Sequence, residues 1–480
     1  MTPDFFFGVT EGDVVYDIET YPNTFTLIAT HTVTEHTWLF EISDRTNDVA
    51  MLRRFMDTLR THNCRMVGFN NLGFDYPVLH AIYSYHHITV TDIYNKAMDI
   101  IKSGNKFAHM IWDNDQVVPQ IDLYKIHHFD NKARATSLKV LEFNMRMDNI
   151  EDLPFPVGAM LTDEQKDILI EYNHHDVKAT LDFYHESKDQ IRFREELTER
   201  YGKNFLNFSD SKIGSEIFIQ RLEETNPGCC YQYVNGKRTI RQTPRESIKL
   251  SECIPTYIDF ENDEFKRIHQ WLSKQTITET KGVFKDLHCH VGGINYHFGT
   301  GGLHASVEWQ SFTATEGRRI QVRDVASMYP NIAIKNKYYP EHLGETFCLI
   351  YEDMYNERKV HKKAGNDAEQ AMLKLALNGT YGNSNNEYSP FYDPKFTMSV
   401  TLTGQLSLAL LCEKLIKTPN LQIIFANTDG VCYICDEWEI PYVDAVCSWW
   451  EQLTQLELET DEVSRIWMRD CNSYIQEYAE

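Results

Sequence analysis

In the run IIFANTDGVCYIC at residues 423–435, two apolar segments flank the polar residues 427–430. This pattern predicts a β-hairpin, because asparagine, aspartate and glycine accept the positive φ angles of tight turns. A second interpretation is that Asp429 lies at the tip of two strands in order to bind a metal. Taken alone, the stretch favours the plain hairpin, so the rest of the sequence must decide about the metal.

Length and composition predict an ordinary globular protein. The 480 residues suffice for roughly three domains, and 42% hydrophobic with 12% aromatic residues can form their cores. No apolar run approaches the roughly 18 residues that a membrane span needs. The N-terminal run MTPDFFFGVTEGD lacks the basic region of a signal peptide. We therefore expect a cytoplasmic protein with no membrane partner.

Charge and cysteine content narrow the function classes. A formal net charge of −23 argues against a protein that coats nucleic acid, although an enzyme that acts on it needs only one basic groove. Eleven cysteines fit a reducing compartment better than a disulfide framework. Cys432 and Cys435 form a CxxC, but on a strand they face opposite sides and no second CxxC partners them. We do not expect a zinc site there.

The hydrophobic pattern predicts a mixed α/β chain with no repeats. Strands are expected at 13–20, 24–30 and 37–42, and helices at 48–61 and 163–202. Residues 206–291 are less regular and contain Pro227, Pro244 and Pro255, which indicates a connecting region. Further on we expect a strand that enters a helix at 319–332, helices at 351–363 and 367–382 around a turn at 364–366, and a long helix, the hairpin, and a helix with a strand in the last hundred residues.

An acidic group gathers in the N-terminal half. Asp17 and Glu19 are two apart on a strand and point the same way, which costs repulsion unless a cation lies between them. Tyr172 and Asp176 share one helix face at i and i+4, and Asp75 lies in a short apolar frame. Each piece alone is also typical of a solvated surface. Together, four carboxylates and a tyrosine suit two-metal hydrolysis of a phosphodiester.

A second group lies in the C-terminal half. In RDVASMYPNI, Asp324 ends a strand and Ser327 begins a helix, which places a carboxylate beside free backbone N–H groups that suit a triphosphate. In KLALNGTYG, Lys374, Asn378 and Tyr381 lie on one helical face. A helix lysine is normally solvated, but this stripe is too polar for a core face. Lys374 can therefore meet a phosphate charge, and its two neighbours can contact a base pair.

The order of these motifs resembles that of family B DNA polymerases. DIE, NLGFD and YNHHD resemble the three exonuclease motifs of the proofreading domain, with Asn71 and Phe74 in the second. DVASMYP, KLALNGTYG and NTDG resemble polymerase motifs A (DxxSLYP), B (Kx₃NxxYG) and C, with Met328 replacing the usual leucine. FGTGGLH resembles the glycine motif that precedes motif A. With all six motifs in order, we expect Asp429 to be a metal ligand mounted on its hairpin.

The resemblance implies an α/β and α+β multidomain fold. We expect an RNase H-like 3′→5′ exonuclease domain at 1–205, a connecting region at 206–290, a palm at 291–335 and 386–480, short helical-hairpin fingers at 336–385, and no thumb. The implied partners are a DNA primer–template and dNTPs. The implied cofactor is Mg²⁺ or Mn²⁺, two per active site.

The resemblance also implies roles for individual residues. The implied catalytic residues are Asp17, Glu19, Asp75, Tyr172, Asp176, Asp324 and Asp429. The six carboxylates among them bind metal, as does Val325, and Tyr172 positions a water. The implied nucleotide-binding residues are Ser327, Tyr329, Arg358, Lys362, Lys374, Asn378 and Tyr381, with Tyr329 packing against the incoming sugar. The implied DNA-binding residues are Asn71, Phe74, Gly301, Gly302, Gly382, Asn427 and Thr428. The pairs His127–His128 and His174–His175 are interpreted as ordinary residues outside the motif positions.

Three departures from the family pattern matter. Asn427 stands where motif C usually has its first aspartate, so we expect it to orient Asp429 or the primer end rather than bind metal. Only 50 residues separate Asp324 from Lys374 and 55 separate Lys374 from Asp429, which favours an ordinary primer terminus over protein priming. Only 51 residues follow Asp429, too few for the basic KxY-type motif and a thumb. We therefore expect the larger part of a divided or truncated bacteriophage-type polymerase, acting in the host cytoplasm with a second polypeptide that supplies the thumb.

Two alternatives accompany this main hypothesis. The chain is either a replicative polymerase with proofreading or a 3′→5′ exonuclease whose polymerase half is inactive alone, and the sequence leaves these open. A non-catalytic replication scaffold is the third possibility. Acidic residues at all six carboxylate motif positions argue against it, because a scaffold does not need them.

Overall fold

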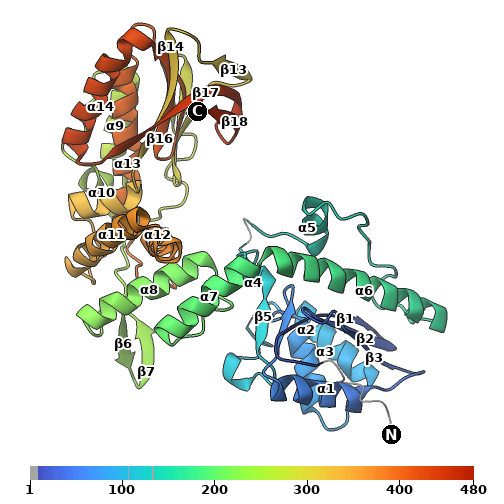
Figure 1. Cartoon of the computed structure of the whole chain (residues 1–480). Helices are drawn as coiled ribbons and strands as arrows, with labels where there is room; N and C mark the ends of the chain where they lie inside the picture. Colours follow the sequence, from blue (N-terminus) through green and yellow to red (C-terminus); the bar gives the residue numbers. More distant parts are fainter. Residues whose placement is uncertain (1–8, 106, 132–133, 480) are drawn as a thin grey trace. The chain divides into compact units, whose positions relative to one another are not determined.

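The computed structural model describes residues 9–105, 107–131 and 134–479, and the chain forms two compact units that meet at Asp210 and Ser211 (Figure 1). Each unit is built around its own mixed or antiparallel sheet. In the part of the chain that the structure describes, no helix is long and apolar enough to cross a membrane. The narrower domain boundaries expected from the sequence stay predictions.

The first unit is built on a five-stranded sheet in the order β3-β2-β1-β4-β5. β1 pairs antiparallel with β2, and β2 with β3, whereas β4 and β5 continue the sheet in parallel with β1. The three strands expected from the sequence are confirmed. The strand bounds are β1 Asp13–Tyr21, β2 Thr24–His31, β3 Thr37–Ser43, β4 Arg65–Gly68 and β5 Gln120–Asp122.

Helices cover both faces of this sheet. Val14, Tyr16 and Ile18 of β1 face α1, α2 and α3, whereas Val15 faces the side of α6, because successive strand residues alternate between the faces. The expected helix at 48–61 is confirmed, and the one at 163–202 is two helices that meet at Ser187. The bounds are α1 Val49–Thr61, α2 Asp75–Ser84, α3 Val90–Lys102, α4 Leu123–Ile126, α5 Leu138–Asn144, α6 Asp163–Glu186 and α7 Lys188–Tyr201.

The second unit is built on a nine-stranded antiparallel sheet in the order β10-β11-β12-β15-β16-β14-β17-β13, with β18 beside β17. The expected strand that enters a helix is confirmed as β14 followed by α10. The bounds are β10 His288–Val291, β11 Ile294–Gly299, β12 Gly302–Ser306, β13 Gln310–Thr313, β14 Arg318–Val325, β15 Gln422–Asn427, β16 Gly430–Asp436, β17 Leu458–Asp470 and β18 Ser473–Tyr478.

Among the described residues, seven α-helices, α8 to α14, belong to the second unit. Six of them have eleven or more residues, and α10 has nine. The most buried is α13, in which nineteen of twenty-two residues are buried. The expected pair of helices around a turn is confirmed as α11 and α12, with Gly365 in the left-handed conformation at φ 72°. The bounds are α8 Asp210–Thr225, α9 Asp263–Ser273, α10 Met328–Asn336, α11 Thr346–Ala364, α12 Asp367–Gly382, α13 Pro394–Leu415 and α14 Ile440–Thr454.

The region 206–291 is more regular than the sequence predicts. It contains α8 and α9, the short hairpin β6 Tyr231–Val234 with β7 Lys237–Ile240, and the small pair β8 Ile248–Lys249 with β9 Thr276–Ile277. The glycine in the middle of α8 has a packing reason. A Cβ on Gly214 would lie 2.0 Å from the carbonyl oxygen of Leu375 in α12, so glycine lets these helices approach closely. This contact fixes the helix that carries Lys374, Asn378 and Tyr381.

Candidate active sites

The N-terminal carboxylates gather where β1 meets α6. Asp17 and Glu19 follow Val15 on the strand face toward α6, and Asp176 projects from that helix. One carboxylate oxygen from each of these three acids lies within 4.8 Å of the others. The structure therefore confirms that Asp17 and Glu19 lie on the same face of β1.

Side chains that the sequence analysis did not single out hold this centre in place. The Asn173 amide donates a 2.7 Å hydrogen bond to Asp17, and the Asn173 oxygen accepts one of 3.1 Å from Thr26. The buried Asp122 carboxylate accepts from the backbone N–H groups of Asn70 at 2.9 Å and Leu72 at 3.2 Å, in the loop before Asp75. The sequence could have marked Asn173, because it lies inside the YNHHD motif. No motif contains Asp122.

The electrostatics of the centre fit a divalent cation. Burial raises the pKa of Asp17 and Glu19 well above the ordinary range, and the neighbouring carboxylates raise both further. Burial raises the pKa of Asp75 to about 7 and that of Asp176 to about 6. A bound divalent cation neutralises carboxylates that lie close together away from water, so these residues fit a metal centre.

Tyr172 and Asp176 lie on one face of α6, as expected. The Tyr172 hydroxyl bonds the Asp176 carboxylate, and burial raises the pKa of Tyr172 strongly. The phenol therefore stays protonated and remains a donor at neutral pH. It is 7% exposed, so it faces the interior of the centre rather than solvent.

The two residues expected to touch a primer end, Asn71 and Phe74, are both largely covered by protein. Asn71 is fully buried, and its amide contacts the side chain of Gln120 at 3.0 Å. Contact with DNA would require this side chain to leave its position. Phe74 is half-buried against the core of the first unit, directly before Asp75. Exposed Asn70, with φ 62°, is the asparagine at the surface of this loop.

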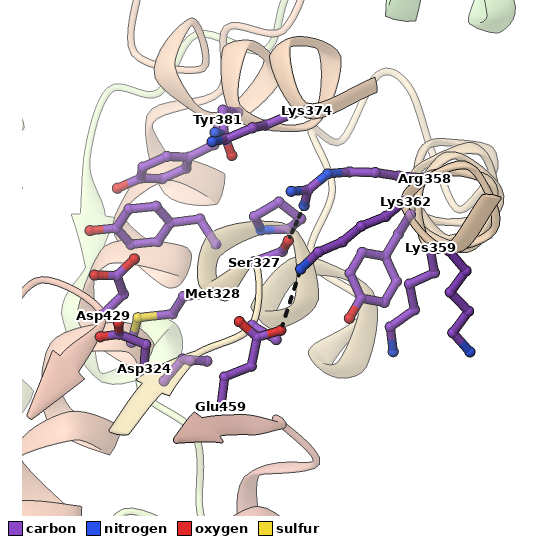
Figure 2. A pocket seen from close by; sticks show the side chains of 17 residues that line it. Asp324, Ser327, Met328, Arg358, Lys359, Lys362, Lys374, Tyr381, Asp429 and Glu459 are labelled. Atoms are coloured by element: carbon purple, nitrogen blue, oxygen red, sulfur yellow. Dashed lines mark hydrogen bonds and ion pairs between the residues drawn. The ribbon is translucent and has the colours of Figure 1, made fainter. Parts of the chain in front are cut away.

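In the second unit, Asp324 and Asp429 lie beside one another at the ends of β14 and of the β15–β16 hairpin (Figure 2). The hairpin prediction is confirmed, but the left-handed residue of the turn is Thr428, at φ 56°. Gly430 is needed for a different reason. A Cβ there would lie 1.8 Å from Oδ1 of Asp324, so the missing side chain leaves room for that carboxylate.

These aspartates form one wall of a cavity of about 910 Å³. Burial raises the pKa of Asp324 to about 6, and the charge of Asp429 adds to this effect. Burial also raises the pKa of Asp429. The pair thus shows the strained like-charge arrangement of the first centre, and it too fits a divalent cation. Val325, the third expected ligand, lines the same cavity and donates its N–H to the Asp429 carbonyl at 2.8 Å.

Cationic side chains of α11 and α12 line the rest of this cavity. Arg358, Lys362 and Lys374, which the sequence predicts, all reach it, together with Asn378 and Tyr381. Arg358 donates a 2.9 Å hydrogen bond to the Ser327 hydroxyl, and Lys362 lies 3.9 Å from a Glu459 carboxylate oxygen (Figure 2). The wall therefore offers positive charge opposite the two aspartates.

Tyr329 stacks on Tyr381 with ring centroids 4.2 Å apart, which joins motifs A and B across the cavity. The Tyr329 hydroxyl donates a 2.8 Å hydrogen bond to the carbonyl of Gly301 in the glycine motif. Ser327 has φ 46°, a strained left-handed conformation for a residue with a side chain. This turn aims the start of α10 at the cavity.

The remaining predicted DNA contacts lie around the hairpin. A Cβ on Gly302 would lie 3.0 Å from Cα of Thr428, so the glycine strand runs directly against the turn. Asn427 donates a 3.2 Å hydrogen bond to the carbonyl of Cys471 and accepts one from Thr428. Asn427 thus ties the hairpin to the β17–β18 turn. Gly382 ends α12 with open space where a Cβ would stand.

Several cavity residues escaped the sequence analysis. Lys359, Lys363, Tyr355 and Glu459 line the cavity, although no motif marked them. Lys359 and Lys363 follow Tyr355 at i+4 and i+8 on α11, so helical periodicity was the one available signal. Glu459 is on β17, far along the chain, and nothing in the sequence pointed to it.

Comparison with known proteins bears on the fold. No protein-family model matches the chain, and no curated protein matches its sequence. Among solved structures, the family B DNA polymerase from the hyperthermophilic archaeon Pyrobaculum calidifontis matches with a TM-score of 0.52 and 15% identity. The fold resembles that of a family B DNA polymerase. The match covers 97% of this chain but only 58% of the archaeal one, so this chain spans less than two thirds of that polymerase.

Proposed function

We propose that the chain is a DNA-directed DNA polymerase with 3′→5′ proofreading exonuclease activity. The observation that carries the proposal is the 910 Å³ cavity in which Asp324 and Asp429 face a wall of lysine and arginine side chains. Paired carboxylates opposite clustered cations suit a metal-bound triphosphate, because the anion needs positive charge at one end and metal at the other.

In this proposal, different residues of the cavity bind the triphosphate, the sugar and base, and the metals. Arg358, Lys362 and Lys374 hold the triphosphate, and the stack of Tyr329 on Tyr381 packs against the incoming sugar and base. Asp324, Asp429 and the backbone of Val325 would hold two Mg²⁺ or Mn²⁺ ions. Bound there, the metals would lower the pKa of the primer 3′-hydroxyl and neutralise charge on the transferring phosphate.

We assign the first centre to removal of unpaired 3′ ends. Asp17, Glu19, Asp75 and Asp176 would hold two divalent ions, which supply an activated water and stabilise the leaving oxygen. The protonated Tyr172 hydroxyl beside Asp176 orients the attacking water. In this proposal the five-stranded mixed sheet under these residues is the RNase H-like domain.

We further propose that firm duplex binding needs a basic element beyond residues 1–480. Duplex affinity grows with the number of phosphates that lysine and arginine neutralise, and this chain has 47 basic against 70 acidic residues. A thumb supplied by a second polypeptide fits this need. Use in bacteriophage replication stays a prediction of the motif order.

The test is primer extension by the purified chain with Mg²⁺ and dNTPs, with and without the product of the neighbouring open reading frame. We expect degradation of single-stranded ends by the chain alone, weak extension that falls steeply as salt rises, and restored extension with the partner. Degradation without extension under any condition would favour the exonuclease alternative. Loss of both activities in a folded protein would favour the scaffold.

A further inference from the structure

A second group of potential metal ligands adjoins the carboxylate centre of the first unit. It contains Glu142 of α5 with His175 and Asp176 of α6, and one ligand atom from each lies within 4.8 Å of the others. His175 Nε2 lies 3.0 Å from Oε2 of Glu142. His175 lies outside the motif positions and is expected to be an ordinary helix residue, but its ring faces the Glu142 carboxylate.

Glu142 carries an unusual unsatisfied oxygen. The residue is 1% exposed, and its Oε1 has no hydrogen-bond partner among the residues that the structure describes. A buried carboxylate oxygen without a hydrogen-bond donor destabilises the fold, because it has lost its hydrogen bonds to water and has formed none within the protein. A cation bound by the Glu142 carboxylate would give this oxygen a partner.

The groups already facing the cluster do not balance its charge. His175 contacts only the other oxygen, Oε2, of Glu142. Lys139 lowers the pKa of Glu19 and of Asp176, but its amino group already pairs with Asp152 at 2.5 Å. The acidic cluster thus has more negative charge than the Lys139 amino group can offset.

We propose that Glu142, His175 and Asp176 form a further binding site for a divalent transition metal such as Mn²⁺, which shares Asp176 with the carboxylate centre. Carboxylates alone suit Mg²⁺ and Mn²⁺, and an imidazole ligand shifts the preference toward the transition metals. Three protein ligands leave positions open for water. The site differs from the proposed exonuclease pair in its ligands, because it uses neither Asp17 nor Glu19.

The chain itself offers a way to isolate this site. The full-length variant Asp17→Ala, Glu19→Ala, Asp429→Ala removes ligands of both proposed catalytic centres and keeps the three residues of interest. Mn²⁺ is the probe, because it binds thiolates poorly and the eleven cysteines therefore compete little. Electron paramagnetic resonance of free Mn²⁺ gives the stoichiometry, and spin-echo modulation from ¹⁴N reports a histidine ligand. Neither readout depends on DNA or on activity.

We expect one bound Mn²⁺ per chain in this background, with nitrogen modulation. Adding His175→Ala should remove the modulation and weaken binding at least about tenfold. His174→Ala is the matched control, because it changes the adjacent exposed histidine and should leave both readouts unchanged. Glu142→Gln keeps the size of the buried side chain and should weaken binding similarly. Absence of nitrogen-coupled Mn²⁺, or equal signals from the His174 and His175 variants, would overturn the site whatever the outcome for the polymerase.

Discussion

The two acidic centres of this chain use the same residue type in different surroundings. In the first unit, carboxylates gather between a strand and a long helix, and Lys139 is a cationic group that influences Asp176. In the second unit, Asp324 and Asp429 face several cationic side chains across an open cavity. Under the proposed function, carboxylates hold metals in both units, and the cations opposite Asp324 and Asp429 add the positive charge that a triphosphate needs.

The largest expected effect comes from Gly430→Ala, which tests the geometry of the second centre. The new Cβ would overlap Oδ1 of Asp324, 1.8 Å away, so the carboxylate must turn out of place. We expect nucleotide addition to fall by about 10²–10³-fold, as when one key transition-state contact is lost. Degradation of single strands is the internal control. A variant that still extends primers normally would show that the position of Asp324 is unimportant.

The cationic wall is tested by Lys374→Ala. Loss of one charged contact to a triphosphate should lower kcat/KM for dNTPs by about 30–160-fold, since such contacts contribute about 2–3 kcal/mol. Lys335→Ala removes an exposed lysine of α10 outside the cavity and should change nothing. Steady-state kinetics compares the two variants. Similar losses in both would mean that general positive charge, rather than this wall, attracts the nucleotide.

In the first centre, Asn173→Ala tests the support of Asp17. The variant removes the 2.7 Å hydrogen bond that orients this carboxylate, and loss of such supporting contacts costs about tenfold or more in activity. Degradation of single-stranded ends should fall accordingly, whereas nucleotide addition should not change. His174→Ala, next along α6 and exposed, serves as the control. An unchanged degradation rate would show that Asp17 is oriented by other groups.

The buried carboxylates predict a pH dependence of stability without metal. The pKa of Asp75 is raised to about 7, so its neutral form favours the folded state. That stabilisation is complete below about pH 4, the unfolded value, and is lost as pH rises through 7. In EDTA we expect the melting temperature of the first unit to fall by about 5 °C between pH 5 and pH 8. Mg²⁺ should reverse the fall at pH 8, and Asp75→Asn should flatten it in EDTA, both measured by thermal unfolding.

The smallest expected effect concerns the departure from motif C. Asn427→Asp restores the usual acidic residue but replaces the amide that donates to the Cys471 carbonyl. A carboxylate facing a carbonyl oxygen should destabilise the second unit by about 1 kcal/mol, the net contribution of a typical hydrogen bond. Chemical denaturation measures this loss, and primer extension should not improve. Faster extension would mean that Asn427 weakens metal binding rather than holding the hairpin.

Local sequence patterns predicted what local physics controls. The alternation in β1 predicted that Asp17 and Glu19 share a face, and helical spacing predicted that Lys374, Asn378 and Tyr381 share another. These predictions hold because strand and helix periods fix side-chain direction. The family resemblance supplied the larger arrangement.

Contacts between distant segments could not be predicted in this way. Gly214 interrupts the helical pattern of α8, and its closeness to Leu375 explains why glycine occupies this position. Glu459 and Asp122 reach their sites through sheet pairing and a loop contact that no short motif encodes. Asn71 shows the reverse case, because a motif position that suggests a surface contact is buried against Gln120.

If the two centres work independently, variants in one should leave the activity of the other unchanged. Asp17→Ala with Glu19→Ala, and separately Asp429→Asn, are assayed on the same primer–template at low salt for removal of unpaired 3′ ends and for nucleotide addition. We expect the first variant to lose degradation alone and the second to lose addition alone. If Asp429→Asn also stops degradation of unpaired ends while the protein stays folded, the assignment of two separate centres is contradicted.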